Sequence, residues 1–188
     1  MSRWKILSSK ELFQTGFFKI REDRCQLPDG RVMPKYYVMQ FPDWVNIVPV
    51  TSEGKVVLVR QYRHGAEREF LEVPGGSTHP GVAEDPLRAA ERELIEETGF
   101  KSTDWFSCGS HFPNPSLQAN RMHTYLALNC KKVAEPNLDP FEDLTVELLS
   151  LQDVYDLWLR GEFSHSIISA SLALALKPLR DAGFRISV

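Results

Sequence analysis

The middle of the chain carries near-continuous apolar runs. Residues 45–51 and 55–62 form two of them, and Ser52-Glu53-Gly54 lies between. Two β-rich runs joined by a short turn that contains glycine predict a hairpin, and the absence of alternation indicates strands buried on both faces. A third run, residues 70–73, predicts another strand. Pro74-Gly75-Gly76 follows directly, and we expect regular structure to end there.

The chain before these runs predicts a separate sheet of short strands. Pro28-Asp29-Gly30 is a strong turn signal, and residues 36–41 are rich in β-forming residues. Pro42-Asp43 then interrupts the pattern. We therefore expect an N-terminal antiparallel β subdomain over residues 1–43 and a main domain over residues 44–188.

A helix is predicted between Asp85 and Gly99. Asp85 is a favourable N-cap, a proline follows it at the first helical position, and Gly99 is a favourable stop. Leu87, Ala90 and Leu94 fall at i, i+3 and i+7, so they share one apolar face. The helix should therefore cover one side of the sheet.

The rest of the chain predicts further strands and two more helices. The strands are residues 123–128 and 145–149. One helix starts at the capping signal of Ser150 and Asp153 and ends before Gly161. The other runs over residues 166–179. Strands of a mixed sheet that are flanked by helices predict an α/β (α+β) fold.

Composition excludes several classes of protein. With 188 residues and 43% hydrophobic content, the chain is long enough for one sizeable core. The net charge is −3 and the basic residues are scattered, which argues against a nucleic-acid partner. The three cysteines lie far apart, which argues against disulfides and zinc and fits a cytoplasmic protein. The longest apolar stretch, residues 167–176, is too short to span a bilayer, so we expect no membrane partner.

Three glutamates near the end of the predicted helix conflict with local helix rules. Glu93, Glu96 and Glu97 share one face because they are spaced i, i+3 and i+4. A like-charged i, i+4 pair costs roughly 0.2–0.5 kcal/mol, and each carboxylate in the last turn loses roughly 0.3–1 kcal/mol to the helix dipole. A hard divalent cation such as Mg²⁺ would remove this conflict. The alternative is a solvated acidic face on which Arg92 pairs with Glu96.

The sequence around these glutamates resembles the Nudix box. Glu84, seven intervening residues and the run from Arg92 to Phe100 match its pattern of Glu, seven residues and Arg-Glu-apolar-x-Glu-Glu-x-Gly-apolar. One departure exists, because seven residues instead of five separate Gly76 from Glu84, and Thr78 stands where the strict spacing has glycine. We interpret this difference as a two-residue insertion in an exposed loop.

The resemblance implies a Nudix-type α/β/α sandwich with a mixed sheet and a set of residue roles. By resemblance, Glu93 and Glu97 are the main metal ligands, and Glu96 and the carbonyl of Gly75 assist them. Arg92 would orient a glutamate through an ion pair. The implied cofactor is Mg²⁺, with Mn²⁺ as a substitute.

Outside the box, the chain resembles the ADP-ribose and nucleoside diphosphate sugar pyrophosphatases. Residues 59–63 resemble the RQYR strand of that branch, and residues 70–76 resemble its ELPAG segment. Pro115 lies sixteen residues after Gly99, a position associated with ADP-ribose hydrolysis, although the residues around Pro115 depart from the usual Ser-Pro-Gly and acidic pattern. His165-Ser166 also resembles the branch, with a serine N-cap as the simpler interpretation.

Substrate-binding residues are expected mainly among the arginines. Arg63 is the first candidate for phosphate contact, because its planar guanidinium matches phosphate oxygens. Ordinary surface charge is the alternative for the other arginines. The full set that we assign to substrate binding is Arg63, Arg60, Arg121, Pro115 and Glu72.

A general base is expected outside the box, because glutamates that bind metal are poor bases. In the resembling branch the base comes from a later loop, which here is residues 136–143. Glu142 is the first candidate, Asp143 and Glu147 are alternatives, and a simple loop carboxylate is the competing interpretation. The residues assigned to catalysis are therefore Glu142, Glu96 and Arg92.

These features together predict metal-dependent hydrolysis of the pyrophosphate bond of nucleoside diphosphate sugars. ADP-ribose is the first expected substrate and GDP-mannose the second, and the products are a nucleoside monophosphate and a sugar phosphate. The alternatives are a Nudix hydrolase of dinucleotides or nucleoside polyphosphates and a non-catalytic module that senses ADP-ribose. The branch also implies a homodimer in which the N-terminal sheet helps to build the partner's nucleotide pocket.

Overall fold

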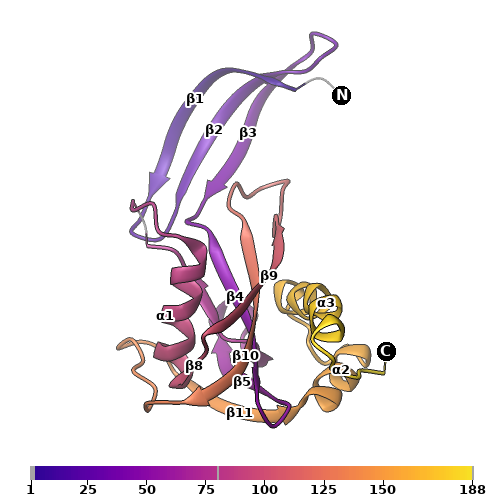
Figure 1. Ribbon diagram of the computed structural model, residues 1–188. Helices are drawn as coiled ribbons and strands as arrows, with labels where there is room; N and C mark the ends of the chain where they lie inside the picture. The colour runs from indigo at the N-terminus through magenta and orange to yellow at the C-terminus, as the bar shows by residue number, and fades with distance from the viewer. Residues whose placement is uncertain (1–2, 80, 188) are drawn as a thin grey trace.

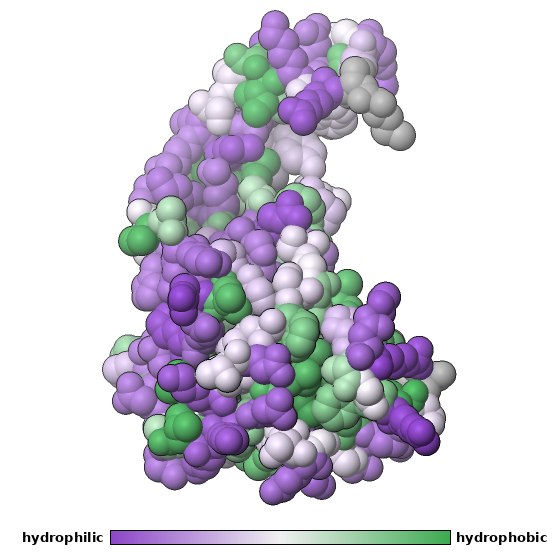
Figure 2. Space-filling view, viewed as in Figure 1, coloured by the Kyte–Doolittle hydropathy of each residue, from purple (hydrophilic) through white to green (hydrophobic). Residues whose placement is uncertain are grey.

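The computed structural model describes residues 3–79 and 81–187 and shows a long β arm attached to a layered body (Figure 1). The arm is an antiparallel sheet in the order β1-β2-β3. Its strands are β1 (Lys5–Gln14), β2 (Lys19–Gln26) and β3 (Val32–Gln40). Every residue of β1 is exposed, and the arm projects from the body in Figure 2. These strands are longer than the short ones that the sequence predicts.

The body is built around an eight-stranded mixed sheet. Its strands are β4 (Trp44–Thr51), β5 (Lys55–Arg63), β6 (Arg68–Glu72), β7 (Gly75–Ser77), β8 (Phe100–Lys101), β9 (Asp104–His111), β10 (Met122–Lys132) and β11 (Leu144–Ser150). β4 and β10 pair in parallel, whereas the other pairings in the described part of this sheet are antiparallel. The predicted hairpin is β4–β5, and both strands are largely buried.

Helices cover both faces of the sheet. α1 (Pro86–Thr98) lies on one face, and α2 (Leu151–Leu159) and α3 (Ser166–Asp181) lie on the other (Figure 1). The 3-10 turn η1 (His64–Ala66) joins β5 to β6. α1 begins and ends as predicted, because Asp85 accepts a hydrogen bond from the backbone N of Leu87 and Gly99 adopts a φ of 72°. Within the two described ranges, no helix is long and apolar enough to cross a membrane.

Apolar side chains fill both helix–sheet interfaces. The larger core lies between the sheet and α2–α3 and includes Val48, Leu58, Leu126, Tyr155 and Leu172. The smaller core lies under α1 and includes Val45, Ile47, Ala90, Leu94 and Ala127. The side chains alternate between the two faces along β4 and β10, so one strand pair serves both cores. This arrangement confirms the predicted α/β/α sandwich with a mixed sheet and an N-terminal antiparallel sheet.

The arm is held to the body by the loop between β9 and β10. The backbone N of Met39 donates to the carbonyl of Leu117 at 2.7 Å, and the backbone N of Ala119 donates to the carbonyl of Met39 at 3.1 Å. The hydroxyl of Tyr36 also donates to the carbonyl of Ser116 at 2.6 Å. A ladder of rings, with neighbouring centroids no more than 6.0 Å apart, continues from the arm into the body through Phe13, Phe18, Phe41 and Trp44. The domain boundary at residue 43 remains a prediction.

The prediction that regular structure ends directly after β6 is wrong. Regular structure does not end at Pro74-Gly75-Gly76, because Gly75–Ser77 forms β7 and pairs with β4. A Cβ atom at Gly75 would overlap the carbonyl oxygen of Val45, so only glycine permits this close pairing. The apolar pattern also fails to predict β9, in which Gly109 has a φ of 107°.

Gly99 offers a test of how tightly the end of α1 is packed. Its φ of 72° is left-handed, and an added Cβ would overlap the carbonyl of Ala134. Gly54 has nearly the same φ, 74°, but open space around it, so Gly54→Ala is a matched control. We expect Gly54→Ala to lose about 1–2 kcal/mol from the left-handed backbone alone, and Gly99→Ala to lose more. Urea unfolding measures both, and equal losses would contradict close packing at Gly99.

Candidate functional site

Two buried carboxylates lie where α1 meets β7. Glu93 and Glu97 have exposed fractions of only 9% and 4%. Nη1 of Arg92 donates to Oε1 of Glu93 at 2.8 Å. The backbone N of Gly75 donates to Oε2 of Glu97 at 2.9 Å. The structure therefore buries two carboxylates, and Arg92 is the cationic side chain that donates to one of them, Glu93.

The two glycines before the loop allow this approach. A Cβ atom at Gly76 would overlap the carboxylate of Glu93, and a Cβ at Gly75 would overlap the β4 backbone. The backbone of β7 can therefore lie directly against the acidic side of α1. The glycine pair has a steric function here, which explains why a strand continues through it.

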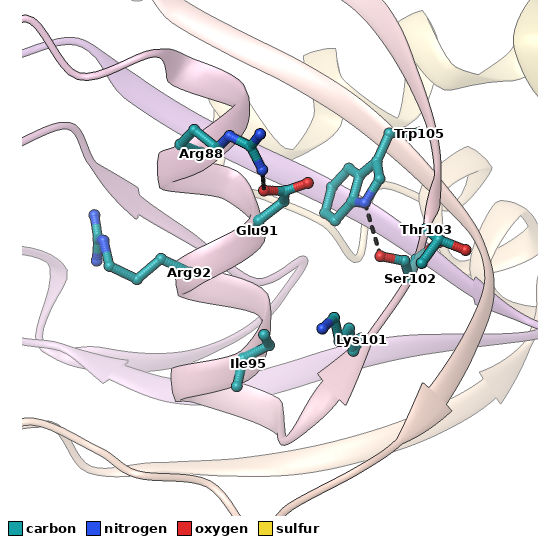
Figure 3. A pocket seen from close by; sticks show the side chains of 8 residues that line it. All are labelled: Arg88, Glu91, Arg92, Ile95, Lys101, Ser102, Thr103 and Trp105. Atoms are coloured by element: carbon teal, nitrogen blue, oxygen red, sulfur yellow. Dashed lines mark hydrogen bonds and ion pairs between the residues drawn. The ribbon is translucent and has the colours of Figure 1, made fainter.

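Arg92 links the third glutamate, Glu96, to Glu93. Its Nη1 also donates to Oε2 of Glu96 at 3.0 Å, and its Nη2 donates to the carbonyl of Ser77 at 3.0 Å. The side chain of Glu96 is 42% exposed. Figure 3 shows a separate hollow beside α1, which Arg92 also lines and in which Glu91 faces Trp105. Arg92 thus organises the acidic face, in agreement with the ion pair that the resemblance implies.

The longer loop before α1 is closed by Glu84. Oε2 of Glu84 accepts hydrogen bonds from the backbone N of His79 at 2.8 Å and lies 2.9 Å from its Nδ1. Oε1 of Glu84 lies 3.6 Å from Nε of Arg92. The extra length is therefore taken up locally, and the loop remains tied to the acidic face.

Burial governs the protonation of both carboxylates. Burial, followed by the charges of Glu93 and Glu142, raises the pKa of Glu97 to about 8, although the Gly75 hydrogen bond opposes this shift. Burial likewise raises the pKa of Glu93, against the opposing effect of Arg92. In a protein that must ionise both groups, a further positive charge is needed beside them.

A divalent cation fits this pair better than it fits the predicted set of three glutamates. Among residues 3–79 and 81–187, no three acidic, histidine or cysteine side chains are grouped closely enough to hold a metal ion. The side chain of Glu96 is more exposed than that of Glu93, although Arg92 contacts both. Mg²⁺ commonly uses only one or two carboxylates and takes its other ligands from carbonyls, waters and substrate phosphates. Glu93 and Glu97 satisfy that requirement.

A hollow of about 510 Å³ opens beside these carboxylates. It brings together residues that are far apart in the sequence, including Glu97, Arg63 and Glu142. Its other walls are mainly apolar or aromatic. They include Phe17 from the turn between β1 and β2, Trp44, Met122, Ile167 and Ile168. The hollow therefore has a charged end and an apolar end, as a nucleotide ligand requires.

Glu72 lies behind the hollow and is completely buried. Its Oε2 accepts from Nε and Nη2 of Arg63 at 2.9 and 2.5 Å. Its Oε1 lies 2.5 Å from Nδ1 of His165. Burial alone would raise the pKa of Glu72, but the hydrogen bonds from His165 and Arg63 outweigh it and lower the pKa. Glu72 is thus a buried, ionised group that supports Arg63, and it is not accessible for the direct substrate contact that we predicted.

The remaining predicted residues lie outside the walls of the hollow. Nε of Arg60 donates to Oε1 of Glu147 at 2.5 Å. Nη2 of Arg121 donates to the hydroxyl of Ser110 at 2.6 Å. Pro115 is exposed in the loop that holds the arm. In this chain, the structure does not bring these three groups together with the acidic face.

His165 and Phe17 are wall residues that sequence reasoning did not select. His165 is the N-cap of α3, but its side chain makes no capping bond, so the serine cap that we considered simpler is wrong. No local pattern links His165 to Glu72, because 93 residues separate them. Phe17 is 82% exposed, and its place beside the hollow depends on how the arm docks.

Comparison with known proteins decides the family. Residues 41–169 match the NUDIX domain, and residues 4–39 match the Nucleoside diphosphate sugar hydrolase N-terminal domain. The chain belongs to the Nudix hydrolase family. The family predicted from the box is therefore confirmed, together with the type of N-terminal sheet.

Several individual Nudix relatives are similar over most of the chain. A Methanol dehydrogenase activator from Bacillus methanolicus is 32% identical over 78% of this chain and 77% of the relative. An ADP-ribose pyrophosphatase from Bacillus subtilis is 28% identical over 94% of this chain and 92% of the relative. An ADP-ribose pyrophosphatase from Mycobacterium tuberculosis is 29% identical over 90% of this chain and 81% of the relative. A solved structure, "Crystal structure of ADP compounds hydrolase", has a TM-score of 0.83 at 25% identity and covers 97% of both chains.

The raised pKa of Glu97 predicts how metal-free stability depends on pH. A folded-state pKa of about 8, against 4.5 ordinarily, means that the folded Nudix protein keeps a proton that the unfolded chain loses. The stability contributed by this group is complete below pH 4.5 and is lost as the pH rises through about 8. Glu97→Gln cannot ionise, so its melting temperature in chelator should increasingly exceed that of the wild type over this window.

Glu135→Gln is the control for this comparison, because the side chain of Glu135 is 84% exposed. Its melting temperature should follow that of the wild type at every pH. Thermal melts in chelator, taken across the titration window, give the comparison. If the Glu97→Gln curve also ran parallel to the wild type, Glu97 would not carry a raised pKa.

Proposed function

We propose that this Nudix hydrolase cleaves the pyrophosphate bond of nucleoside diphosphate sugars, with ADP-ribose as the first substrate and GDP-mannose as the second. The observation that carries this proposal is that one hollow brings the buried Glu97 together with Arg63 and Glu142. The aromatic side chains of Phe17 and Trp44 line the same hollow. The match of the arm to the N-terminal domain of nucleoside diphosphate sugar hydrolases supports it. So do the two relatives named ADP-ribose pyrophosphatase.

The acidic face would hold Mg²⁺, or Mn²⁺ in its place, through Glu93, Glu97 and the carbonyl of Gly75. When bound, such an ion neutralises phosphate charge and lowers the pKa of bound water. Arg92 keeps Glu93 and Glu96 oriented, which preserves the ligand geometry. Arg63 adds a positive charge at the charged end of the hollow, where its Nη1 is not bound to Glu72 and can donate to a phosphate oxygen. The apolar end would take the base or the sugar.

Glu142 is our proposed general base. It lies in the loop before β11 and lines the hollow, whereas the alternative Glu147 is engaged by Arg60. The charge of Glu142 acts on both Glu93 and Glu97, so its carboxylate is close to the expected metal ligands. Within that loop, Oε2 of Glu142 accepts a hydrogen bond from the backbone N of Asp139 at 3.0 Å.

A substrate panel tests the proposal. Purified protein is incubated with ADP-ribose, GDP-mannose, other nucleoside diphosphate sugars, dinucleotides and nucleoside triphosphates, with Mg²⁺ or Mn²⁺, and the products are identified by mass. The proposal requires a nucleoside monophosphate and a sugar phosphate as the preferred products. Preferred turnover of dinucleotides or nucleoside triphosphates would replace it. Binding without turnover under all conditions would indicate a sensor.

Removing the proposed base should slow chemistry and leave binding largely intact. Glu142→Gln keeps the size of the side chain but cannot accept a proton, so we expect kcat to fall about 10²–10⁴-fold. KM should change little. Steady-state kinetics with ADP-ribose gives the result. Asp143→Asn and Glu147→Gln are the matched controls, and a larger loss in either would reassign the base.

The exposed arm supports the proposed homodimer. β1 is an uncovered edge strand along its whole length, and it carries exposed Ile6 and Leu12. Such an edge is normally paired or protected. We propose that a second copy of the chain covers it.

Charge on the edge strand should therefore separate the two copies. Light scattering of the wild type should give twice the 21.5 kDa of one chain, and Ile6→Glu with Leu12→Glu should give the monomer mass. Val133→Glu, at an equally exposed apolar position on the body, is the control and should leave the mass unchanged. A monomeric wild type would refute the dimer.

A further inference from the structure

Arg63, Glu72 and His165 form one hydrogen-bonded contact. The proposed chemical step does not use this contact directly. Glu72 is fully buried, whereas the side chains of Arg63 and His165 are 44% and 32% exposed and line the hollow. The carboxylate thus joins two groups that face the ligand space. Because a carboxylate only accepts hydrogen bonds, Nδ1 of His165 is the donor to Oε1.

The imidazole of His165 is fixed by this bond and by packing. Its ring lies against Phe70, with 5.8 Å between the centroids. Although His165 occupies the N-cap of α3, its side chain makes no capping bond, so the ring is committed to Glu72. Among the described residues, Nε2 of His165 has no hydrogen-bond partner. Within the protein, the ring is therefore held by a hydrogen bond through Nδ1 only.

Loss of the Nδ1 donor would affect Arg63. A buried carboxylate oxygen left without a donor is strongly unfavourable, so Glu72 would have to move or admit water. Nε and Nη2 of Arg63 are both bound to the same carboxylate and would move with it. In the intact arrangement, two nitrogens of the guanidinium are anchored, and Nη1 is left for a ligand.

We propose that His165 is a positioning residue for substrate binding, which holds Glu72 so that Glu72 holds Arg63 toward the phosphates of the substrate. This inference rests on the proposed function, and it concerns affinity more than the chemical step. It connects the start of α3 to the charged end of the hollow. It also gives Glu72 a role that its complete burial permits.

Three substitutions at one position separate the functions of the two ring nitrogens. His165→Ala removes both nitrogens. His165→Asn places an amide N–H near the position of Nδ1, whereas His165→Gln reaches the position of Nε2. A positioning role requires only the donor to Glu72, so Asn should rescue and Gln should not. Ser164→Ala, at an exposed position beside the start of α3, is the control for that region.

The measurement is steady-state hydrolysis of ADP-ribose with Mg²⁺, with folding checked by thermal melting. We expect His165→Ala and His165→Gln to raise KM about tenfold and to change kcat less than about threefold, as when uniform binding is lost. His165→Asn should lie within about threefold of the wild type in KM. In an Arg63→Ala background, His165→Ala should add no further loss, because it acts through Arg63.

Other outcomes overturn the inference. Rescue by Gln and not by Asn would mean that Nε2 contacts the ligand directly. Wild-type kinetics in all three variants, a loss confined to melting temperature, or additive losses with Arg63→Ala would exclude positioning. Failure of the proposed function looks different, because the wild type would then cleave no nucleotide sugar. In that case calorimetric binding of ADP-ribose gives the same ranking of variants, and a wild type that neither cleaves nor binds it overturns both proposals.

Discussion

The close approach of the β7 backbone to the acidic side of α1 is the constraint on which the site depends. Gly75 and Gly76 leave no room for a side chain, so Glu93 and Glu97 are shielded from water at the end of a helix whose dipole already disfavours them. Arg92 and one backbone N–H compensate only part of this charge. The fold therefore stores an electrostatic conflict that a bound cation would relieve.

Glu72 shows the opposite solution to the same problem. Like Glu97 it is almost inaccessible to solvent, yet its pKa is lowered because Arg63 and His165 occupy both of its oxygens. Glu97 has no comparable cationic partner, and its pKa rises. Burial alone does not separate a carboxylate that binds metal from one that supports the structure. The difference lies in whether the folded chain supplies its own positive charge.

Capping residues, turn residues and residue spacing were sufficient to predict the elements that depend on neighbouring residues in the chain. The caps of α1, the β4–β5 hairpin and the acidic face follow from Asp85, Gly99 and residue spacing. β7 could not be predicted, since a glycine pair normally indicates a break and becomes a strand only through its fit against β4. The contact between Glu72 and His165 depends on tertiary packing across most of the body. The pairing of Arg60 with Glu147 is likewise a matter of packing, whereas the pairing of Arg92 with Glu96 follows from their i, i+4 spacing.

The loop that carries Pro115 illustrates how a residue outside the hollow can still be connected to it. Pro115 does not line the hollow, but its loop binds Met39 and Tyr36 of the arm through backbone groups. The arm in turn carries Phe17, which reaches the apolar end of the hollow. A residue that shapes this loop therefore acts on the ligand space through the docking of the arm. The shape of the apolar end of the hollow therefore depends on where the arm sits as well as on the residues of the body.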